Sequence, residues 1–428
     1  MIQVSQTIAQ LKNIVHEETS GAAFYHVEFR RIMDEIRLAL DNQDSDKALT
    51  VLIHGALDLR ASDVHLEIHE KSSTLRFRID GALAPLGDMT IKEQSMIVER
   101  MKYRSNLKLN IHNVPQDGKI RLGKEGRDAQ IDVRVSVMPT RYGESIVCRI
   151  LDASQTILNM DGLGIIGPQN TIIKKTLQKK QGMILVTGPT GSGKTTTLYS
   201  LIEILRKPED KIITLEDPIE YQIPGILQSE INERDGYTFA LGLRSILRHD
   251  PDIIMVGEIR DLDTATAAVQ AALTGHLVLS TLHTKSALET IERLMNIGVS
   301  DFDIASSVDC VIAQRLVRRV CPDCAALADI GFTPDTKLLS RYSDQQPHPQ
   351  KGAGCEKCGH TGYRGRMGIY EVLEVNDVIR DAIRAKKTIS EMYALAKENG
   401  YLTLAEDALA KVSLGMTTLD ECRKVGIL

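Results

Sequence analysis

A glycine-rich segment at residues 188–195 carries the strongest chemical signal in the sequence. It reads Gly-Pro-Thr-Gly-Ser-Gly-Lys-Thr and directly follows the apolar run Met183–Val186. This is the phosphate-loop spacing, in which a glycine and four residues precede Gly-Lys-Ser/Thr. Glycines let backbone N–H groups converge on an anion, because no Cβ blocks positive φ or close approach. The apolar run predicts a strand, and residues 196–205 predict a helix, so the motif has its required context and predicts binding of a nucleoside triphosphate.

The loop itself supplies most of the expected nucleotide contacts. The expected nucleotide-binding residues are Gly188, Pro189, Thr190, Gly191, Ser192, Gly193, Lys194, Thr195 and Thr196. The ammonium group of Lys194 can reach the β- and γ-phosphates, and the hydroxyl of Thr195 can bind Mg²⁺.

Three further polar clusters follow apolar runs downstream of the loop, at predicted strand ends, where α/β proteins bind ligands. The clusters are Ile212–Glu220 with its three terminal carboxylates, Asp250–Asp261 with Glu258, and Thr274–Thr284 with two histidines. Hydrolysis needs a residue that positions water, a metal holder and a γ-phosphate sensor, and the clusters offer candidates for each. Any one cluster alone is also typical of a helix cap, a surface ion pair or a structural histidine. That alternative weakens because all three follow one phosphate loop in order.

Four cysteines predict a metal centre. Cys321, Cys324, Cys355 and Cys358 form two CxxC pairs about thirty residues apart. Four thiolates suit tetrahedral Zn²⁺ in a closed structural site. Unmetallated thiols or a redox pair are the alternative, which two consecutive CxxC pairs disfavour. Basic residues beside the pairs also suit a nucleic-acid zinc ribbon, although we favour a role in thiolate stabilisation and subunit contacts. The other three cysteines, Cys148, Cys310 and Cys422, are expected to be core or incidental thiols.

The bulk composition narrows the class of protein. The chain has 428 residues and a net charge of −5, which gives no electrostatic case for nucleic acid as the main partner. The first residues lack the basic start of a signal peptide, and no apolar stretch has the length of a membrane span. We therefore expect a cytoplasmic protein that associates with the membrane only through partners.

The periodicity of apolar residues divides the chain into six segments. In order, we expect a short helical segment (1–45), a small α+β domain (46–151), a linker rich in Gly and Asp (152–169), an α/β core with a parallel sheet flanked by helices (170–318), a tetracysteine module (319–370) and a helical region (371–428). Capping signals at Thr388 and Thr403 predict helix starts in the last segment.

Taken together, these motifs resemble the traffic ATPases of type II secretion and type IV pilus assembly. The matching segments are 188–199, 216–220, 247–261 and 274–284, with further similarity at 61–65, 78–81, 115–118 and 362–371. The resemblance covers nearly everything from residue 48 to the end. It implies a RecA-like P-loop ATPase core preceded by a small PAS-like α+β domain, with the tetracysteine zinc module and C-terminal helices following.

The resemblance also implies roles for individual residues of the core. Glu220 is implied to activate the attacking water, and Glu258 to take the metal-linked role. His283 is implied to sense the γ-phosphate, with His276 as a weaker candidate.

Two arginines of the amino-terminal domain complete the implied site. Arg134 and Arg149, which lie fifteen residues apart, match family arginines that reach the bound nucleotide. A guanidinium group neutralises charge that develops on the transferred phosphoryl group. Without the resemblance, each of the two is typical of an ordinary exposed strand residue.

The resemblance also implies the function of a homohexameric motor. It would hydrolyse Mg-ATP and drive pilin or pseudopilin assembly through an inner-membrane platform protein and an adaptor of that machine, with no nucleic acid. The amino-terminal domain would close over ATP with 152–169 as the hinge. A non-hydrolysing scaffold is one alternative, disfavoured by intact Glu220 and Glu258. A retraction or DNA-uptake motor of the same superfamily is another, and the zinc module argues against retraction. A nucleic-acid translocase is disfavoured by the charge balance.

Overall fold

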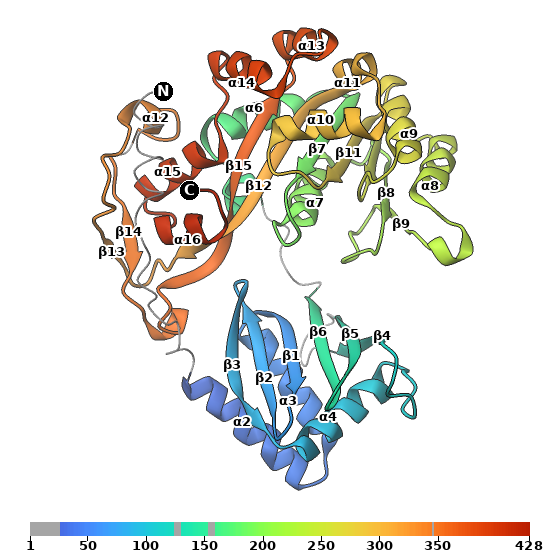
Figure 1. Ribbon diagram of the computed structural model, residues 1–428, viewed down its shortest axis with the longest axis vertical. Coiled ribbons are helices and arrows are strands. Elements are labelled where there is room, and N and C mark those ends of the chain that lie inside the picture. Colours follow the sequence, from blue (N-terminus) through green and yellow to red (C-terminus); the bar gives the residue numbers. More distant parts are fainter. Residues whose placement is uncertain (1–25, 124–129, 153–158, 345) are drawn as a thin grey trace. The chain divides into compact units, whose positions relative to one another are not determined.

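The computed structural model describes residues 26–123, 130–152, 159–344 and 346–428 (Figure 1). The chain divides into two compact units. One contains the described residues of 17–156 together with 353–364, and the other contains those of 157–352 and 365–428. The helices expected before residue 26 lie outside the described residues.

A six-stranded antiparallel sheet forms the centre of the first unit, with strand order β3-β2-β1-β6-β5-β4. Its strands are β1 (Ala61–Ile68), β2 (Ser73–Ile79), β3 (Ala82–Met89), β4 (Gln116–Gly123), β5 (Gln130–Thr140) and β6 (Gly143–Asp152). Apolar and polar residues alternate in the sequence at 64–69, 74–79, 130–136 and 145–150, which predicts half-buried strands, and these segments lie in β1, β2, β5 and β6. Strands β3 and β4 were not anticipated.

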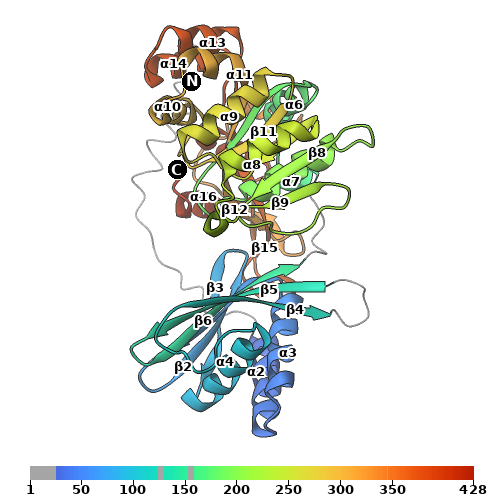
Figure 2. The ribbon, with the colours of Figure 1, turned by 90° about the vertical axis from the view of Figure 1, so that its right-hand side faces the viewer.

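Three helices cover one face of this sheet, as Figure 2 shows. They are α2 (His26–Asp41), α3 (Ser45–Asp58) and α4 (Ile91–Arg104). The side chain of Asp44 accepts a hydrogen bond from the Lys47 N–H and caps α3. Alternate strand residues such as Leu66, Phe77 and Val135 are buried against the helices. The residues between them point to the opposite face, so this sheet has one apolar and one polar side.

A seven-stranded sheet organises the second unit, with strand order β15-β12-β7-β11-β10-β8-β9. The strands are β7 (Gly182–Thr187), β8 (Ile212–Glu216), β9 (Leu227–Glu230), β10 (Ile253–Val256), β11 (Leu277–Leu282), β12 (Val308–Val320) and β15 (Tyr363–Glu374). The pairs from β12 to β9 are parallel. All residues of β7, β8, β10 and β11 are buried, as expected for strands covered on both faces. The predicted α/β class with a parallel sheet is confirmed.

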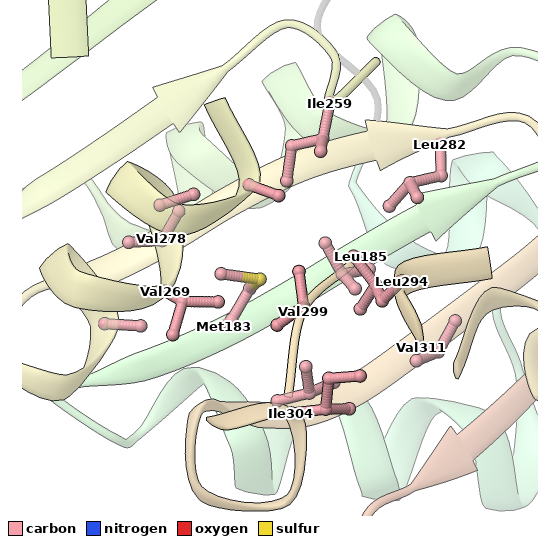
Figure 3. Close-up of a cluster of buried hydrophobic side chains, with 14 of the residues drawn as sticks. Met183, Leu185, Ile259, Val269, Val278, Leu282, Leu294, Val299, Ile304 and Val311 are labelled. Atoms are coloured by element: carbon pink, nitrogen blue, oxygen red, sulfur yellow. The ribbon is translucent and has the colours of Figure 1, made fainter. Parts of the chain in front are cut away.

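Helices pack on both faces of this sheet. One core joins it to α8 (Phe239–Ile246), α9 (Leu262–Leu273), α10 (Ala287–Ile297), α11 (Asp301–Ser307), α13 (Asp377–Arg384) and α14 (Ile389–Glu398). The other core contains α5 (Met160–Leu163), α6 (Gly167–Leu177) and α7 (Lys194–Leu205). Successive residues of β7 alternate between the two cores: Met183 and Leu185 enter the first, shown in Figure 3, and Ile184 and Val186 enter the second.

The described residues after β12 form a two-stranded antiparallel sheet and four further helical segments besides α13 and α14. These elements are β13 (Ala325–Leu327), β14 (Gln350–Gly352), α12 (Thr336–Leu339), the 3₁₀ turn Glu356–Cys358, α15 (Leu404–Ser413) and α16 (Leu419–Lys424). Capping boxes at Thr388 and Thr403 begin α14 and α15, which confirms the predicted helix starts. Strand β15 returns the chain to the edge of the main sheet beside β12. Within the described ranges, we find no helix with the length and hydropathy of a membrane span.

Candidate nucleotide-binding site

The carboxyl ends of four neighbouring parallel strands meet at one edge of the seven-stranded sheet. The strands are β7, β11, β10 and β8, in that spatial order. Their register pairs Thr187 with Leu282, and Val256 with Ser280 and Leu215. Each strand is followed by one of the polar segments that the sequence indicated. The structure therefore brings the phosphate loop and the carboxyl-terminal ends of all three polar clusters to the same edge.

Backbone geometry shapes the phosphate loop between β7 and α7. Gly188, Gly191 and Gly193 have φ values of 149°, 79° and 87°. A Cβ at Gly188 would lie 2.5 Å from the backbone oxygen of Gln314, so no larger residue fits there. Helix α7 begins at Lys194 with Gly193 as N-cap and without a side-chain cap. The first N–H groups of this helix can thus bind an anion, which the helix dipole also favours.

Lys194 lies across the loop. Its Nζ donates hydrogen bonds to the backbone oxygens of Gly188, at 2.9 Å, and Pro189, at 3.3 Å. Burial and the nearby Arg315 lower the pKa of this ammonium group, while Glu258 opposes them. A phosphate in the loop would give the ammonium group an anionic partner in place of two carbonyls, which is a stronger interaction.

Glu258, Arg260 and His283 form a polar cluster beside the loop. Glu258 makes an ion pair with Arg260, and its Oε2 lies 3.6 Å from Nε2 of His283. The Glu258 side chain is 16% exposed and that of His283 is 51% exposed. Burial lowers the pKa of His283, as do the cations Lys194 and Arg260, whereas Glu258 raises it. His283 is therefore neutral at pH 7 and can both donate and accept a hydrogen bond at this edge.

The two histidines of the third cluster lie at opposite ends of β11. His283 follows the strand, whereas His276 precedes it, where its Nδ1 lies 3.0 Å from the backbone oxygen of Ala271. A strand of this length separates its ends by roughly 20 Å. The structure thus brings only His283 to the edge that carries the phosphate loop.

The acidic segment after β8 divides into residues with different surroundings. Glu216 is buried and accepts hydrogen bonds from the Tyr199 hydroxyl, from Thr214 at 2.6 Å and from Gln228 at 3.0 Å. Burial raises the pKa of Glu216. Its oxygens are occupied by the protein, so it anchors β8 to α7 and β9. Glu220 is half-buried beside Tyr199 and Glu216.

Arg134 and Arg149 are direct cross-strand neighbours in the six-stranded sheet. They pair in the register of β5 and β6, so both side chains leave the same face, opposite the helices. Asp63 stands next in the row, is 4% exposed, and accepts a hydrogen bond from Arg149 Nε at 2.9 Å. Arg78 and Lys119 extend the row on either side. Four cations thus line up across this face around one buried carboxylate.

The four predicted metal ligands lie together. The Sγ atoms of Cys321, Cys324, Cys355 and Cys358 are all within 4.8 Å of one another. The backbone N–H groups of Cys355 and Gly362 donate to Cys358 Sγ at 3.2 and 3.3 Å, which stabilises a thiolate. Four sulfur donors at this spacing fit tetrahedral Zn²⁺.

The remaining cysteines are buried, which confirms the prediction of core thiols. They are Cys148, Cys310 and Cys422. Burial raises the pKa of Cys148 and of Cys422 to about 12, so neither thiol ionises at neutral pH.

Two groups beside the loop were missed by the reasoning from sequence. Gln314 follows four buried apolar residues of β12 (310–313), and its amide contacts the phosphate loop. Thr187 bonds to Thr284 through Oγ1–Oγ1 at 2.7 Å, which ties the end of β7 to the segment after β11. A glutamine directly after a buried apolar run was the one available signal, and it does not reveal which strand lies alongside.

Comparison with known proteins gives a consistent assignment. The family model described as "Type II/IV secretion system protein" matches residues 39–424. The chain is 43% identical to the type IV pilus assembly ATPase PilB of Acinetobacter baylyi, over 89% of this chain and 66% of that protein. It is 41% identical to the type II secretion system protein E of Aeromonas hydrophila, over 93% of this chain and 80% of that one. Among solved structures, the pilus retraction motor PilT with bound ADP superposes with a TM-score of 0.58 at 27% identity, over 88% of this chain and 96% of that one.

Proposed function

The chain belongs to the type II/IV secretion system protein family, whose members include secretion and pilus ATPases, and on that premise we propose that it is a hexameric motor powered by Mg-ATP hydrolysis. The work of the motor is the assembly of pilins or pseudopilins through an inner-membrane platform protein and its adaptor. The motor acts in the cytoplasm and reaches the membrane only through these partners, without nucleic acid.

The observation that carries this proposal is the gathering of phosphate loop, acidic segments and His283 at one sheet edge. Hydrolysis requires groups that hold the phosphates, the metal and the attacking water in fixed positions. The loop and the start of α7 supply N–H donors, and Lys194 supplies a cation. Neither a simple binding module nor a structural protein needs the carboxylates as well.

Individual residues take the following roles. Residues 188–196 bind the triphosphate, and the hydroxyl of Thr195 binds Mg²⁺, which Glu258 holds through water. Glu220 activates the attacking water, and His283 contacts the γ-phosphate. Mg²⁺ neutralises charge on the phosphates when bound.

The amino-terminal unit contributes Arg134 and Arg149. Their shared face and their adjacency suit a pair that engages one phosphoryl group. Closure of this unit over ATP and its release after hydrolysis would form the working stroke, with residues 152–169 as the hinge. The tetracysteine cluster binds Zn²⁺ and stabilises the segment around the β13–β14 sheet.

Steady-state ATPase measurements test the proposal. Wild-type protein should turn over Mg-ATP, and Glu258→Ala should lower kcat by at least about 100-fold while still binding Mg-ADP. Glu292→Ala is the matched control, because Glu292 is an exposed carboxylate on α10; it should leave turnover within about twofold. If the wild type hydrolyses no ATP beyond Lys194→Ala, the chain is a nucleotide-binding scaffold. Light scattering in the presence of a nucleotide analogue measures the proposed hexamer.

A retraction motor is the second candidate, because a solved retraction motor covers 88% of the chain at 27% identity. The two functions predict opposite phenotypes for cells that carry only the Glu258→Ala protein. An assembly motor would leave these cells without surface pili or without the secreted substrate. A retraction motor would leave them with an excess of pili.

A further inference from the structure

Gln314 lies where β12 passes the start of the phosphate loop. The parallel register of β12 and β7 runs to Ala313, which pairs with Thr187, the last residue of β7. Gln314 is the next residue of β12 and therefore lies beside Gly188, the first residue of the loop. Its side chain is completely buried. Burial of a primary amide costs free energy unless its N–H donors and its oxygen acceptor form hydrogen bonds.

The amide joins the loop to the helix that follows it. Nε2 of Gln314 donates to the backbone oxygen of Ser192 at 2.7 Å. Oε1 accepts from Thr197 Oγ1 at 2.9 Å. Ser192 belongs to the loop and Thr197 to the first turn and a half of α7, so one side chain spans the corner between them.

The bond to Ser192 fixes a peptide plane. In a trans peptide the C=O of one residue and the N–H of the next point in opposite directions. Because the Ser192 carbonyl points into the core toward Gln314, the Gly193 N–H must point out of the core. Gly193 is the N-cap of α7, where an anion would bind.

Sterics alone do not select this orientation. Gly193 has φ of 87° and no Cβ, and glycine accepts both signs of φ about equally. A flipped Ser192–Gly193 peptide would present a carbonyl oxygen to the phosphates instead of a donor. The hydrogen bond from Gln314 is the contact that disfavours this flip.

We propose that Gln314 is a positioning residue for nucleotide binding, which holds the Gly193 N–H toward the phosphates through its bond to Ser192. This inference rests on the proposed ATPase function and deepens it. The Gly193 N–H would bind a phosphate shared by ATP and ADP, so its loss weakens the ground state and the transition state equally. Such uniform binding changes KM and leaves kcat unchanged.

Three variants of the full chain separate positioning from simple structural support. Gln314→Met removes both hydrogen bonds at similar volume. Thr197→Val removes only the bond on the helix side. Gln169→Met is the matched control, because Gln169 is 2% exposed and its Nε2 donates to the Tyr342 hydroxyl at 2.8 Å, in α6 and away from the loop. Calorimetric titration with Mg-ADP and with Mg-ATPγS, thermal unfolding without nucleotide, and steady-state kinetics are measured for each.

Gln314→Met should raise Kd for both nucleotides and KM for ATP by about tenfold, with kcat within about twofold of wild type. Thr197→Val should raise Kd less than about threefold, since the Ser192 bond remains. Gln169→Met should lower the unfolding temperature without changing Kd. Equal Kd values for Gln314→Met and Gln169→Met, or a loss confined to kcat, would overturn the inference.

A second substitution at position 314 covers the case in which Gln314→Met does not fold. Gln314→Glu keeps the shape and the acceptor for Thr197, and its ionised carboxylate has no donor for Ser192, so Kd is measured at about pH 8.5, where ionisation is favoured. It should raise Kd for Mg-ADP by at least about tenfold, and an unchanged Kd would contradict the inference. If the wild type binds neither nucleotide, the proposed function itself fails, which is a distinct result.

Discussion

A buried ion pair on α15 gives the sharpest energetic prediction. Asp407 and Lys411 lie one turn apart with both side chains 1% exposed, and Lys411 Nζ is 2.6 Å from Asp407 Oδ2. Lys411 also donates to the Gly368 backbone oxygen at 2.8 Å. Asp407 accepts from the Tyr370 N–H at 2.7 Å and from the Tyr342 hydroxyl at 3.0 Å. The pair therefore joins α15 to β15, at the edge of the main sheet, and to Tyr342 in the segment that follows α12.

Lys411→Met keeps the length of the side chain and removes its charge. At this separation and an effective dielectric of 20, the attraction within the pair is about 6 kcal/mol, most of which offsets the desolvation of the two ions. The variant leaves Asp407 buried without its cation, which costs about 3–5 kcal/mol of the free energy of unfolding. The hydrogen bonds from Tyr370 and Tyr342 remain, so we expect a value near the lower end of that range.

The loss should depend on pH. Burial raises the pKa of Asp407, and removal of Lys411 raises it further, because the cation lowers it. In the folded variant, the Asp407 carboxyl stays protonated at pH values at which the unfolded chain has already released this proton. A folded pKa above the unfolded one gives stability that is fully present below the unfolded pKa and lost as pH rises through the folded pKa. The destabilisation should thus be smaller at about pH 5 than at about pH 7.5.

Denaturant unfolding at both pH values measures this effect. Lys424→Met is the matched control, because Lys424 pairs with Glu421 at 3.1 Å but is 60% exposed, and it should cost no more than about 0.5 kcal/mol. Asp407→Asn combined with Lys411→Met should recover part of the loss, since no buried charge remains. Equal stability of the Lys411→Met and Lys424→Met proteins at about pH 7.5, or the same loss at both pH values, would refute the reasoning.

Two further predictions concern the metal centre and the arginine row. Cys358→Ser should lower bound Zn²⁺ from about one ion per chain to a small fraction and should reduce the unfolding temperature. Metal analysis and calorimetry measure these two effects. Full retention of zinc would contradict the four-thiolate site. Asp63→Asn weakens the hold on Arg149 and should lower ATP turnover roughly tenfold without changing Mg-ADP affinity. Glu67→Gln, on the same face and paired with Arg76, is the control and should stay within about twofold; equal activities of the two variants would exclude a special role for Asp63.

Local sequence patterns predicted much of the core of the site. The phosphate loop, the strand before it and the helix after it are encoded within about twenty contiguous residues. A short apolar run predicts a buried strand, and the first polar residue after the run marks the end of that strand. This pattern identified each of the acidic and histidine-bearing segments. Strands that run parallel then share an edge, so the α/β class already implied where these segments would meet.

Such local patterns do not predict contacts between distant segments of the chain. Nothing in the spacing of Arg134 and Arg149 shows that they face each other across β5 and β6, with Asp63 beside them. The parallel pairing of β11 with β7 places His276, which precedes β11, at the end of that strand away from the phosphate loop. The cysteine pairs dominate the pattern of residues 319–370, and nothing in that pattern predicts that β15 joins the main sheet.

The sequence by itself determined the chemistry of this protein: a phosphate loop, carboxylates at strand ends, and four thiols that suit one metal ion. These features depend on residue type and on spacing over a few residues, which local backbone geometry translates directly into structure. Only the tertiary structure decided which groups support that chemistry, such as Gln314 beneath the loop and Asp63 within the arginine row. Their roles arise from strand order and register, which bring residues from distant parts of the chain into contact, and no local pattern specifies which ones.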